Sequence, residues 1–317
     1  MELLVTGANG FVGHALCAEA AARHWKVRAA TRRPCRFDAA IENIVVGEVD
    51  GNTDWAAALQ GVDVVIHLAA RVHVMQDNAA DPLAEFRKVN LEGTANLARQ
   101  AARSGVRRFV YVSSIKVNGE ATTYDSRFTE SGFPAPQDPY GASKWEAEQI
   151  LHRVSDETGL EVVIVRPPLV YGEEVKGNFS QMLSIVEKAY PLPFASIRNL
   201  RSLIYVGNLA DALLACATRP EAAGQTYLVS DGEDLSTPDL IRLLANFMDV
   251  PSRLFPCPSS LLQLAGRATG KSRQIERLLG SLRVDSAKIR RDLNWVPPYS
   301  LQQGLQATAE WYRDQHT

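Results

Sequence analysis

The 317-residue chain has few of the residues that mark several classes of protein. Its four cysteines, Cys17, Cys35, Cys216 and Cys257, are scattered, with no Cys-x-x-Cys pair and no nearby histidine pattern. This distribution argues against a disulfide framework or a zinc site and favours free thiols in a reducing compartment. No apolar run approaches the length of a membrane span. We therefore expect no metal and no transmembrane segment.

The chain also lacks an excess of charge of either sign. Its net charge is −2, with 46% hydrophobic and 22% charged residues, which is typical of an ordinary soluble globular protein. This balance gives no electrostatic reason to expect nucleic acid or a membrane surface as a partner. The first residues, 1–6, enter directly into a strand pattern and lack the basic and apolar regions of a signal peptide. We expect a cytoplasmic protein.

Short apolar runs alternate with helical patterns through the first half of the chain. The predicted strands cover residues 3–6, 26–30, 43–47, 62–68, 108–113 and 161–165. Helices are predicted over 11–23, from 53 to 59 with Thr53 as the cap, from Asp81-Pro82 and from Pro139. Strand alternating with helix implies right-handed crossovers and a parallel sheet covered on both faces. The predicted fold is α/β, a doubly wound parallel sheet of the Rossmann type.

After Arg166 the pattern changes, because prolines become frequent and helices dominate. Thr237-Pro238 predicts one of these helix starts by a cap followed by proline. We divide the chain into a dinucleotide-binding domain over residues 1–165 and a substrate domain over residues 166–317. The second domain is expected to be smaller and mostly helical, with some segments returning to the first.

A glycine-rich loop joins the first predicted strand to the first helix, with the sequence Gly7-Ala8-Asn9-Gly10-Phe11-Val12-Gly13. Its glycines permit a tight turn and let a pyrophosphate approach the backbone, and the helix N-terminus offers N–H groups and a positive dipole. The spacing is one residue longer than the usual dinucleotide fingerprint. Alone, such glycines are as well explained by a structural turn. Directly after the first strand they predict dinucleotide binding.

The end of the second predicted strand carries Thr31, Arg32 and Arg33, with no acidic residue. An enzyme that uses NAD usually places a carboxylate here on the ribose 2′-hydroxyl, whereas arginines suit a 2′-phosphate. The sequence therefore favours NADP(H). NAD(H) stays possible if both arginines are ordinary surface residues. Glu48 and Val49, after the third strand, are expected near the adenine.

Tyr140 and Lys144 are four residues apart, so on a helix they share one face. A neighbouring ammonium would lower the pKa of the phenol toward the range of a general acid–base. Ser114, at the end of a strand, lies where sites form in such sheets. Tyr-x-x-x-Lys alone also occurs as a surface pair. The order of glycine loop, strand-end serine and Tyr140–Lys144 is far more specific and predicts an NAD(P)-dependent oxidoreductase.

These motifs resemble the extended short-chain dehydrogenase/reductases of the NAD-dependent epimerase/dehydratase family, essentially from end to end. The matching runs are Thr6-Gly7-Ala8-Asn9-Gly10-Phe11-Val12-Gly13, His67-Leu68-Ala69-Ala70, Val89-Asn90 with Gly93-Thr94, Ser113-Ser114, Tyr140-Gly141-Ala142-Ser143-Lys144, Arg166-Pro167, Arg201-Ser202-Leu203-Ile204-Tyr205-Val206 and Leu293-Asn294-Trp295.

The resemblance implies a catalytic triad of Ser114, Tyr140 and Lys144, with Tyr140 and Lys144 also contacting the cofactor. It implies that the cofactor is lined by residues at neighbouring strand ends, which are Leu68, Ala69, Ala70, Asn90, Ser113 and Pro167. It further implies a nucleoside-diphosphate sugar as substrate, with Arg201 at the diphosphate and Arg283 as a second candidate there. The other implied substrate contacts are Lys116, Asn118, Asn178, Pro193 and Phe194. A surface ion pair, a helix cap or a core position would explain several of these equally well.

Departures from the family pattern narrow the chemistry. The acidic pair of the 4,6-dehydratases is replaced by Ile115 and Lys116, and the run Ser113–Glu120 resembles 4-keto reductases and 4-epimerases of bacterial surface-polysaccharide synthesis. Pro168 replaces an asparagine of some sugar epimerases. The arginines after the second strand favour an exchangeable NADPH and hence a reductase of a UDP-4-keto-6-deoxy-N-acetylhexosamine, as in O-antigen sugar synthesis.

Other functions stay open at this point. A 4-epimerase of UDP-glucose or UDP-N-acetylglucosamine with tightly bound NAD is the main alternative. A reductase of non-nucleotide carbonyls and a non-catalytic NAD(P)-sensing protein are further ones, although intact Ser114, Tyr140 and Lys144 argue against the sensor. A homodimer is a family-level expectation.

Overall fold

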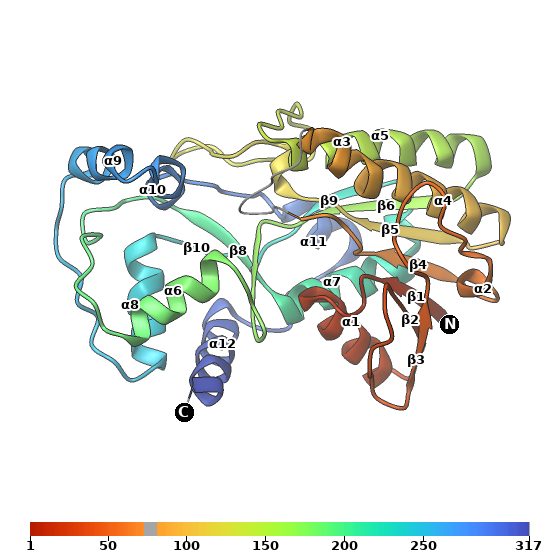
Figure 1. Cartoon of the computed structure of the whole chain (residues 1–317), viewed down its shortest axis with the longest axis horizontal. Helices are drawn as coiled ribbons and strands as arrows, with labels where there is room; N and C mark the ends of the chain where they lie inside the picture. Colours follow the sequence, from red (N-terminus) through yellow and green to blue (C-terminus); the bar gives the residue numbers. More distant parts are fainter. Residues whose placement is uncertain (73–80, 317) are drawn as a thin grey trace.

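The computed structural model describes residues 1–72 and 81–316, and a seven-stranded parallel sheet forms its centre (Figure 1). The strand order is β3-β2-β1-β4-β5-β6-β9, and every neighbouring pair is parallel. The strands are β1 (Glu2–Thr6), β2 (Lys26–Thr31), β3 (Ile41–Val45), β4 (Val64–His67), β5 (Arg108–Val112), β6 (Glu161–Arg166) and β9 (Thr226–Leu228). The Rossmann-type sheet predicted from the alternating pattern is confirmed.

Helices cover both faces of this sheet because successive strand residues point to opposite sides. In β1, Leu3 and Val5 enter one core and Leu4 enters the other. The first core is closed by α1 (Phe11–Ala22), α7 (Val206–Thr218) and α11 (Ala287–Leu293), and the second by α2 (Ala56–Leu59), α4 (Thr94–Arg103) and α5 (Pro139–Thr158). The sheet is therefore doubly wound, and β9 and α7 come from the second half of the chain.

The direction of winding reverses at β1. The chain runs outward from β1 to β3, then returns to β4 on the other side of β1 and continues outward. In such sheets the connections after the two strands at the reversal diverge, and ligands bind in the crevice at their carboxyl ends. That places the loops after β1 and β4 at the mouth of the expected site.

A helix begins after Asp81, whose side chain accepts a hydrogen bond from the Ala84 N–H at 3.1 Å. It starts as α3 (Pro82–Arg87), passes through a π-helical turn at Lys88–Gly93 and continues as α4. π-helical turns inside α-helices are frequent at functional sites. Here the turn buries Asn90, which is 1% exposed.

A second region, mostly helical, lies to the left of the seven-stranded sheet in Figure 1. A small sheet of order β10-β8-β7 packs there under helices. The elements of this second region are β7 (Leu169–Tyr171), α6 (Asn178–Glu187), β8 (Arg201–Tyr205), β10 (Asp234–Leu235), α8 (Thr237–Phe247), α9 (Ser259–Ala268), α10 (Ser272–Leu279) and α12 (Leu301–His316). Short 3-10 turns lie elsewhere in the chain, at Ile115–Val117 and Pro220–Ala222. Among the described residues, no helix is long and apolar enough to cross a membrane, and no cluster of three His, Cys, Asp or Glu side chains is arranged to hold a metal.

Three local predictions are wrong. The third strand covers Ile41–Val45, two residues earlier than predicted, and it pairs with β2 from Val27↔Ile41 to Thr31↔Val45. Thr53 does not cap α2, since its hydroxyl donates to the Glu48 carbonyl at 2.7 Å and accepts from the Asp50 N–H. The cap of α8 is Ser236, not Thr237, whose hydroxyl donates to the Leu278 carbonyl. In each case the backbone groups at the start of the element are paired in another way, through a different strand register or by a neighbouring polar residue.

Candidate active site

The glycine loop lies at the carboxyl end of β1 and packs against the end of β4. Gly7 has a φ of +66°, and a Cβ there would lie 2.8 Å from the Ala69 nitrogen. A Cβ at Gly13 would lie 2.3 Å from the Gly7 carbonyl oxygen. Glycine is therefore required at both positions, at Gly7 by the backbone that follows β4 and at Gly13 by the loop itself. Because no side chain caps α1, the N–H groups of its first turn can bind an anion.

Within this loop, Asn9 and Gly10 are exposed, whereas Phe11 and Val12 are half-buried. The exposed pair can face a diphosphate. Phe11 and Val12 pack on the core that lies under β7 and β8. The loop is thus anchored on one side and open on the other.

His67, the last residue of β4, fixes the position of the loop that follows β4. Thr6 Oγ1 accepts from the Ala69 N–H at 3.1 Å and forms a hydrogen bond with His67 Nδ1 at 2.6 Å. His67 Nε2 forms a hydrogen bond with Thr94 Oγ1 at 3.0 Å. Burial, with a contribution from the Lys144 charge, lowers the pKa of His67 to about 3. A neutral imidazole thus holds half-buried Leu68, Ala69 and Ala70 beside the glycine loop.

Asn90, on the π-helical turn, joins that loop to α5. Its Oδ1 accepts from the Arg71 N–H at 2.8 Å, and its Nδ2 donates to the Arg71 carbonyl and to Ser143 Oγ. Ser143 in turn donates to the Tyr140 carbonyl at 2.8 Å. The carboxamide therefore ties the end of β4 to the first turn of the helix that carries Tyr140 and Lys144.

Ser114, Tyr140 and Lys144 are brought together at the carboxyl end of β5. Ser114 caps the short turn that follows β5, and its hydroxyl hydrogen-bonds Tyr140. Lys144 Nζ donates to the Val112 carbonyl at 2.9 Å and lies 6.0 Å from the centre of the Tyr140 ring. The arrangement can hold an oxygen atom between a serine hydroxyl and a phenol, with a cation behind them.

Burial governs the protonation of this group. It raises the pKa of Tyr140 to about 12, aided by the charge of Asp138 and opposed by the hydrogen bond with Ser114. It lowers the pKa of Lys144 to about 7, against the attraction of Glu148. The prediction that the Lys144 ammonium lowers the pKa of Tyr140 is therefore wrong for the protein alone. Desolvation raises the pKa of the phenol more than the hydrogen bond with Ser114 lowers it, and Tyr140 rests as a neutral phenol.

Lys116 lies on the other side of Tyr140, with Nζ 5.9 Å from the ring centre. It forms ion pairs with Asp138 and with Glu120, the latter at 2.9 Å. Asp138 also caps α5 by accepting the Gly141 N–H at 2.7 Å. Lys116 thus anchors the start of α5 to the turn after Ser114.

A buried network that was not predicted lies behind the triad. Glu148 accepts from Ser113 Oγ at 2.5 Å and from Arg166 through Nε at 2.9 Å and Nη2 at 2.5 Å. Arg166 Nη1 donates to Asn118 Oδ1 at 3.0 Å, and Asn118 Nδ2 donates to the Thr129 carbonyl. Both the oxygen and the nitrogen of the Asn118 carboxamide thus form hydrogen bonds that point away from the crevice. The signal that was missed is the position of Glu148, one helical turn beyond Lys144.

The cofactor candidates after β2 and β3 lie at the other end of the crevice. Thr31 is buried and donates to the Arg33 carbonyl at 2.9 Å, whereas Arg32 is 69% exposed and lies 3.7 Å from Glu48, which is 76% exposed. Val49 is buried in the core against Gly93. Arg32, Arg33 and Glu48 are therefore accessible to a ligand, and Val49 supports them from behind.

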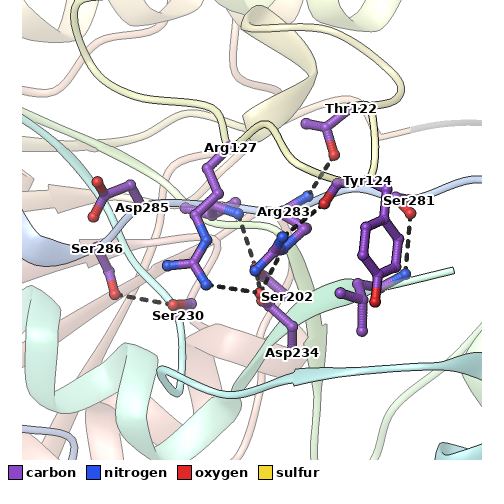
Figure 2. Close-up of polar contacts among 12 residues, drawn as sticks. Thr122, Tyr124, Arg127, Ser202, Ser230, Asp234, Ser281, Arg283, Asp285 and Ser286 are labelled. Carbon is purple, nitrogen blue, oxygen red and sulfur yellow. Dashed lines mark hydrogen bonds and ion pairs between the residues drawn. The ribbon is translucent and has the colours of Figure 1, made fainter.

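Arg201 and Arg283 lie on neighbouring segments, because residue 201 of β8 bridges to Leu282. Arg201 Nη1 donates to the Arg277 and Gly280 carbonyls, at 2.9 and 3.1 Å, and burial lowers the pKa of its guanidinium. Figure 2 shows the Arg283 guanidinium held by Asp234, at 2.8 Å, and by the Tyr124 carbonyl, at 2.7 Å. Both guanidinium groups thus already donate hydrogen bonds to oxygen atoms of the protein.

The remaining candidates lie around these elements. Asn178 is the exposed first residue of α6, whose cap is Gly177, and Phe194 packs half-buried on the core of the second region beside Pro193. Buried Pro167 accepts the Ile115 N–H through its carbonyl at 3.0 Å. Pro167 therefore holds the turn that contains Ser114 against the end of β6.

Comparison with known proteins gives a consistent result. A family model described as the NAD dependent epimerase/dehydratase family matches residues 3–230. A UDP-glucose 4-epimerase of Vibrio cholerae is 43% identical over 98% of this chain and 94% of its own length. The crystal structure of UDP-glucuronic acid 4-epimerase from Bacillus cereus in complex with NAD is similar in fold, with a TM-score of 0.79, 21% identity and full coverage of both chains. MoeE5 in complex with UDP-glucose and NAD gives a TM-score of 0.80 at 23% identity, again over both full chains.

The Glu148–Arg166 pair yields a stability prediction. Glu148→Gln leaves a buried guanidinium without its counter-charge, so we expect the free energy of unfolding to fall by about 3 kcal/mol. Glu146→Gln, two residues away, breaks an exposed pair with Arg87 and should change it by less than about 1 kcal/mol. Urea denaturation of both variants measures the difference, and equal effects would contradict the buried role of Glu148.

The lowered pKa of His67 predicts acid sensitivity. Between pH 6.5 and 3 the unfolded chain binds a proton at His67 that the folded protein does not, so stability falls as pH falls. This histidine contributes up to about 1.4 kcal/mol per pH unit in that window. His67→Asn should give a shallower dependence of the unfolding free energy on pH than the wild type, with exposed His152→Asn as control. An unchanged slope in His67→Asn would show that His67 is protonated in the folded state.

Proposed function

The chain belongs to the NAD dependent epimerase/dehydratase family, and on that premise we propose that it transfers hydride and a proton at C4 of a UDP-sugar. Ser114 holds the C4 oxygen, and Tyr140 exchanges a proton with it. Lys144 holds the nicotinamide ribose, and its protonated form supplies positive charge beneath the phenol. The nicotinamide, when bound, supplies or accepts the hydride.

The residues around the crevice fit a dinucleotide. A Cβ at Gly7, Gly10 or Gly13 would crowd the backbone of the loop or of Ala69, so the glycines keep the loop tight, and the uncapped start of α1 supplies N–H donors for a pyrophosphate. Arg32, Arg33 and Glu48 are accessible at the end where the adenosine would lie. Leu68, Ala69 and Ala70 line the middle of the crevice. The loops that form the walls of the crevice are held in place by buried residues that do not face the ligand, namely Val49, Asn90, Ser113 and Pro167.

We propose reduction of a UDP-4-keto-6-deoxy-N-acetylhexosamine as the reaction, as in the synthesis of surface-polysaccharide sugars. The observation that carries this is the pair of exposed arginines at the end of β2, Arg32 and Arg33, with no acidic residue beside them in that segment. A ketone that receives hydride needs a proton on its oxygen, and the resting phenol is ready to donate it. Exposed Arg32 and Arg33 suit the 2′-phosphate of NADPH.

A 4-epimerase that retains NAD is the second candidate. The Vibrio cholerae relative supports it by name and by its identity. So does Glu48, which lies 3.7 Å from Arg32 and would repel a 2′-phosphate while accepting a ribose hydroxyl. Dehydration is not proposed, because Ile115 and Lys116 follow Ser114 in place of an acidic pair.

One set of assays separates these functions. The purified protein is tested for bound dinucleotide, then incubated with the 4-keto-6-deoxy sugar plus NADPH or NADH, and separately with UDP-glucose or UDP-N-acetylglucosamine alone. We expect oxidation of NADPH only with the keto sugar. Interconversion of C4 epimers without added reductant would favour the epimerase. Inactivity in every assay would overturn the assignment to UDP-sugars.

Tyr140→Phe tests the proton transfer. Removal of the phenol hydroxyl should lower turnover by roughly 10² to 10⁴, the usual contribution of a positioned acid or base. Dinucleotide binding, followed by quenching of protein fluorescence, should stay near the wild-type value. The control Tyr190→Phe removes an exposed hydroxyl and should leave turnover unchanged. Substantial activity in Tyr140→Phe would exclude it as the proton donor.

Arg32→Ala with Arg33→Ala tests the cofactor preference. Loss of charge-assisted hydrogen bonds to a 2′-phosphate should weaken NADPH by roughly tenfold or more, with little effect on NADH. Titration of each dinucleotide measures the two affinities. Arg36→Ala, an exposed residue of the same loop, is the matched control. An equal loss for both cofactors, or none, would remove the argument for NADPH.

A further inference from the structure

Helix α9 carries two apolar faces, although a surface helix of a globular protein needs only one. One face is used inside the protein, where Leu262 is buried and Gly266 packs so closely on α10 that a Cβ would lie 2.9 Å from Ile275 Cγ1. The other face holds Leu261, Leu264, Ala265 and Ala268, and all four are exposed. Their spacing places them in one stripe along the helix. We call these four residues the α9 stripe.

The stripe is large for an exposed surface. Leu261 is 55% exposed and Leu264 is 62% exposed, on adjacent turns of the helix. Single exposed apolar residues are normal on protein surfaces, but contiguous ones mark contact sites. The stripe is therefore a candidate contact surface.

The surroundings of the α9 stripe are basic. Among residues 250–271, Arg253, Arg267 and Lys271 are exposed and no acidic residue occurs, whereas Arg277 and Arg283 further along form ion pairs with Glu120 and Asp234. The whole chain, by contrast, has a net charge of −2. Arg267 lies on α9 at the flank of the stripe, and Lys271 lies in the turn to α10; both are exposed. The prediction of no membrane partner was based on the net charge of the whole chain, which does not reveal this local excess of positive charge.

The hairpin of α9 and α10 stands at the end of the molecule opposite the seven-stranded sheet, with α9 outermost (Figure 1). The hairpin is also joined to the candidate site, because Arg201 donates to the Arg277 and Gly280 carbonyls at the end of α10.

We propose that the α9–α10 hairpin docks the protein on an anionic membrane surface. An apolar stripe flanked by basic side chains is the pattern of a helix that lies in the bilayer interface, with leucines among the acyl chains and cations at the lipid phosphates. A second copy of the chain fits less well. A two-fold contact through α9 would bring like charges together.

The test uses the full chain and sedimentation with vesicles of phosphatidylcholine, with or without phosphatidylglycerol. The wild type should sediment with the anionic vesicles, and high salt should release it. Absence of sedimentation, or equal sedimentation with neutral vesicles, overturns the proposal. Self-association through the hairpin without vesicle binding, seen by analytical ultracentrifugation, overturns it in favour of a dimer contact.

Variants locate the contact. Leu261→Asp with Leu264→Asp should abolish vesicle binding, and Arg267→Ala with Lys271→Ala should weaken it by roughly fivefold for each charge removed. Val296→Asp changes an apolar residue that is 69% exposed outside the hairpin and should bind as the wild type does. Circular dichroism and turnover in solution should be unchanged in all three. Full vesicle binding by the leucine variant would place the contact elsewhere.

Discussion

The position of α5 relative to the carboxyl ends of β5 and β6 is the constraint on which the candidate site depends. The carboxylate of Glu148 holds that position, because it accepts at once from Ser113 on the β5 side and from Arg166 at the end of β6. Lys144 is one turn away on the same helix and reaches the Val112 carbonyl. A shift of α5 by a fraction of a turn would therefore separate Tyr140 from Ser114. The buried ion pair is best understood as setting geometry, since burial of charge by itself contributes little stability.

Two further contacts make that geometry continuous with the glycine loop. Neutral His67 links Thr6 of β1 to Thr94 of α4, and Asn90 links the loop after β4 to Ser143 of α5. Both side chains are buried, and both satisfy backbone or hydroxyl groups that would otherwise lack a partner. The two ends of the crevice, one for an anion and one for proton exchange, thus rest on a common set of hydrogen bonds.

Much of the fold was predictable because it rests on local patterns. Alternation of apolar runs with helical segments predicted the parallel sheet, and Asp81-Pro82 predicted the start of α3. The order of glycine loop, Ser114 and Tyr140–Lys144 predicted which strand ends meet. Prediction failed where a choice depends on neighbours distant in sequence. The register of β3 is set by β2, and the hydroxyls of Thr53 and Thr237 are drawn to carbonyls of other segments. The role of Glu148 required knowledge of Arg166 across the sheet.

The protonation of Tyr140 shows the same limit in electrostatic terms. Sequence spacing placed an ammonium beside a phenol, and the charge of that ammonium alone would lower the pKa of the phenol. The spacing carries no information about desolvation, which acts on both groups in opposite directions and favours their neutral forms. In the folded protein Lys144 lies 6.0 Å from the centre of the Tyr140 ring and donates to a backbone carbonyl, so its attraction for a phenolate is weak compared with the effect of burial. A neutral phenol next to Ser114 can donate its proton, and it can act as a base only after that proton has been lost. The structure thus adds to the sequence the burial of both groups, which their spacing along α5 does not reveal.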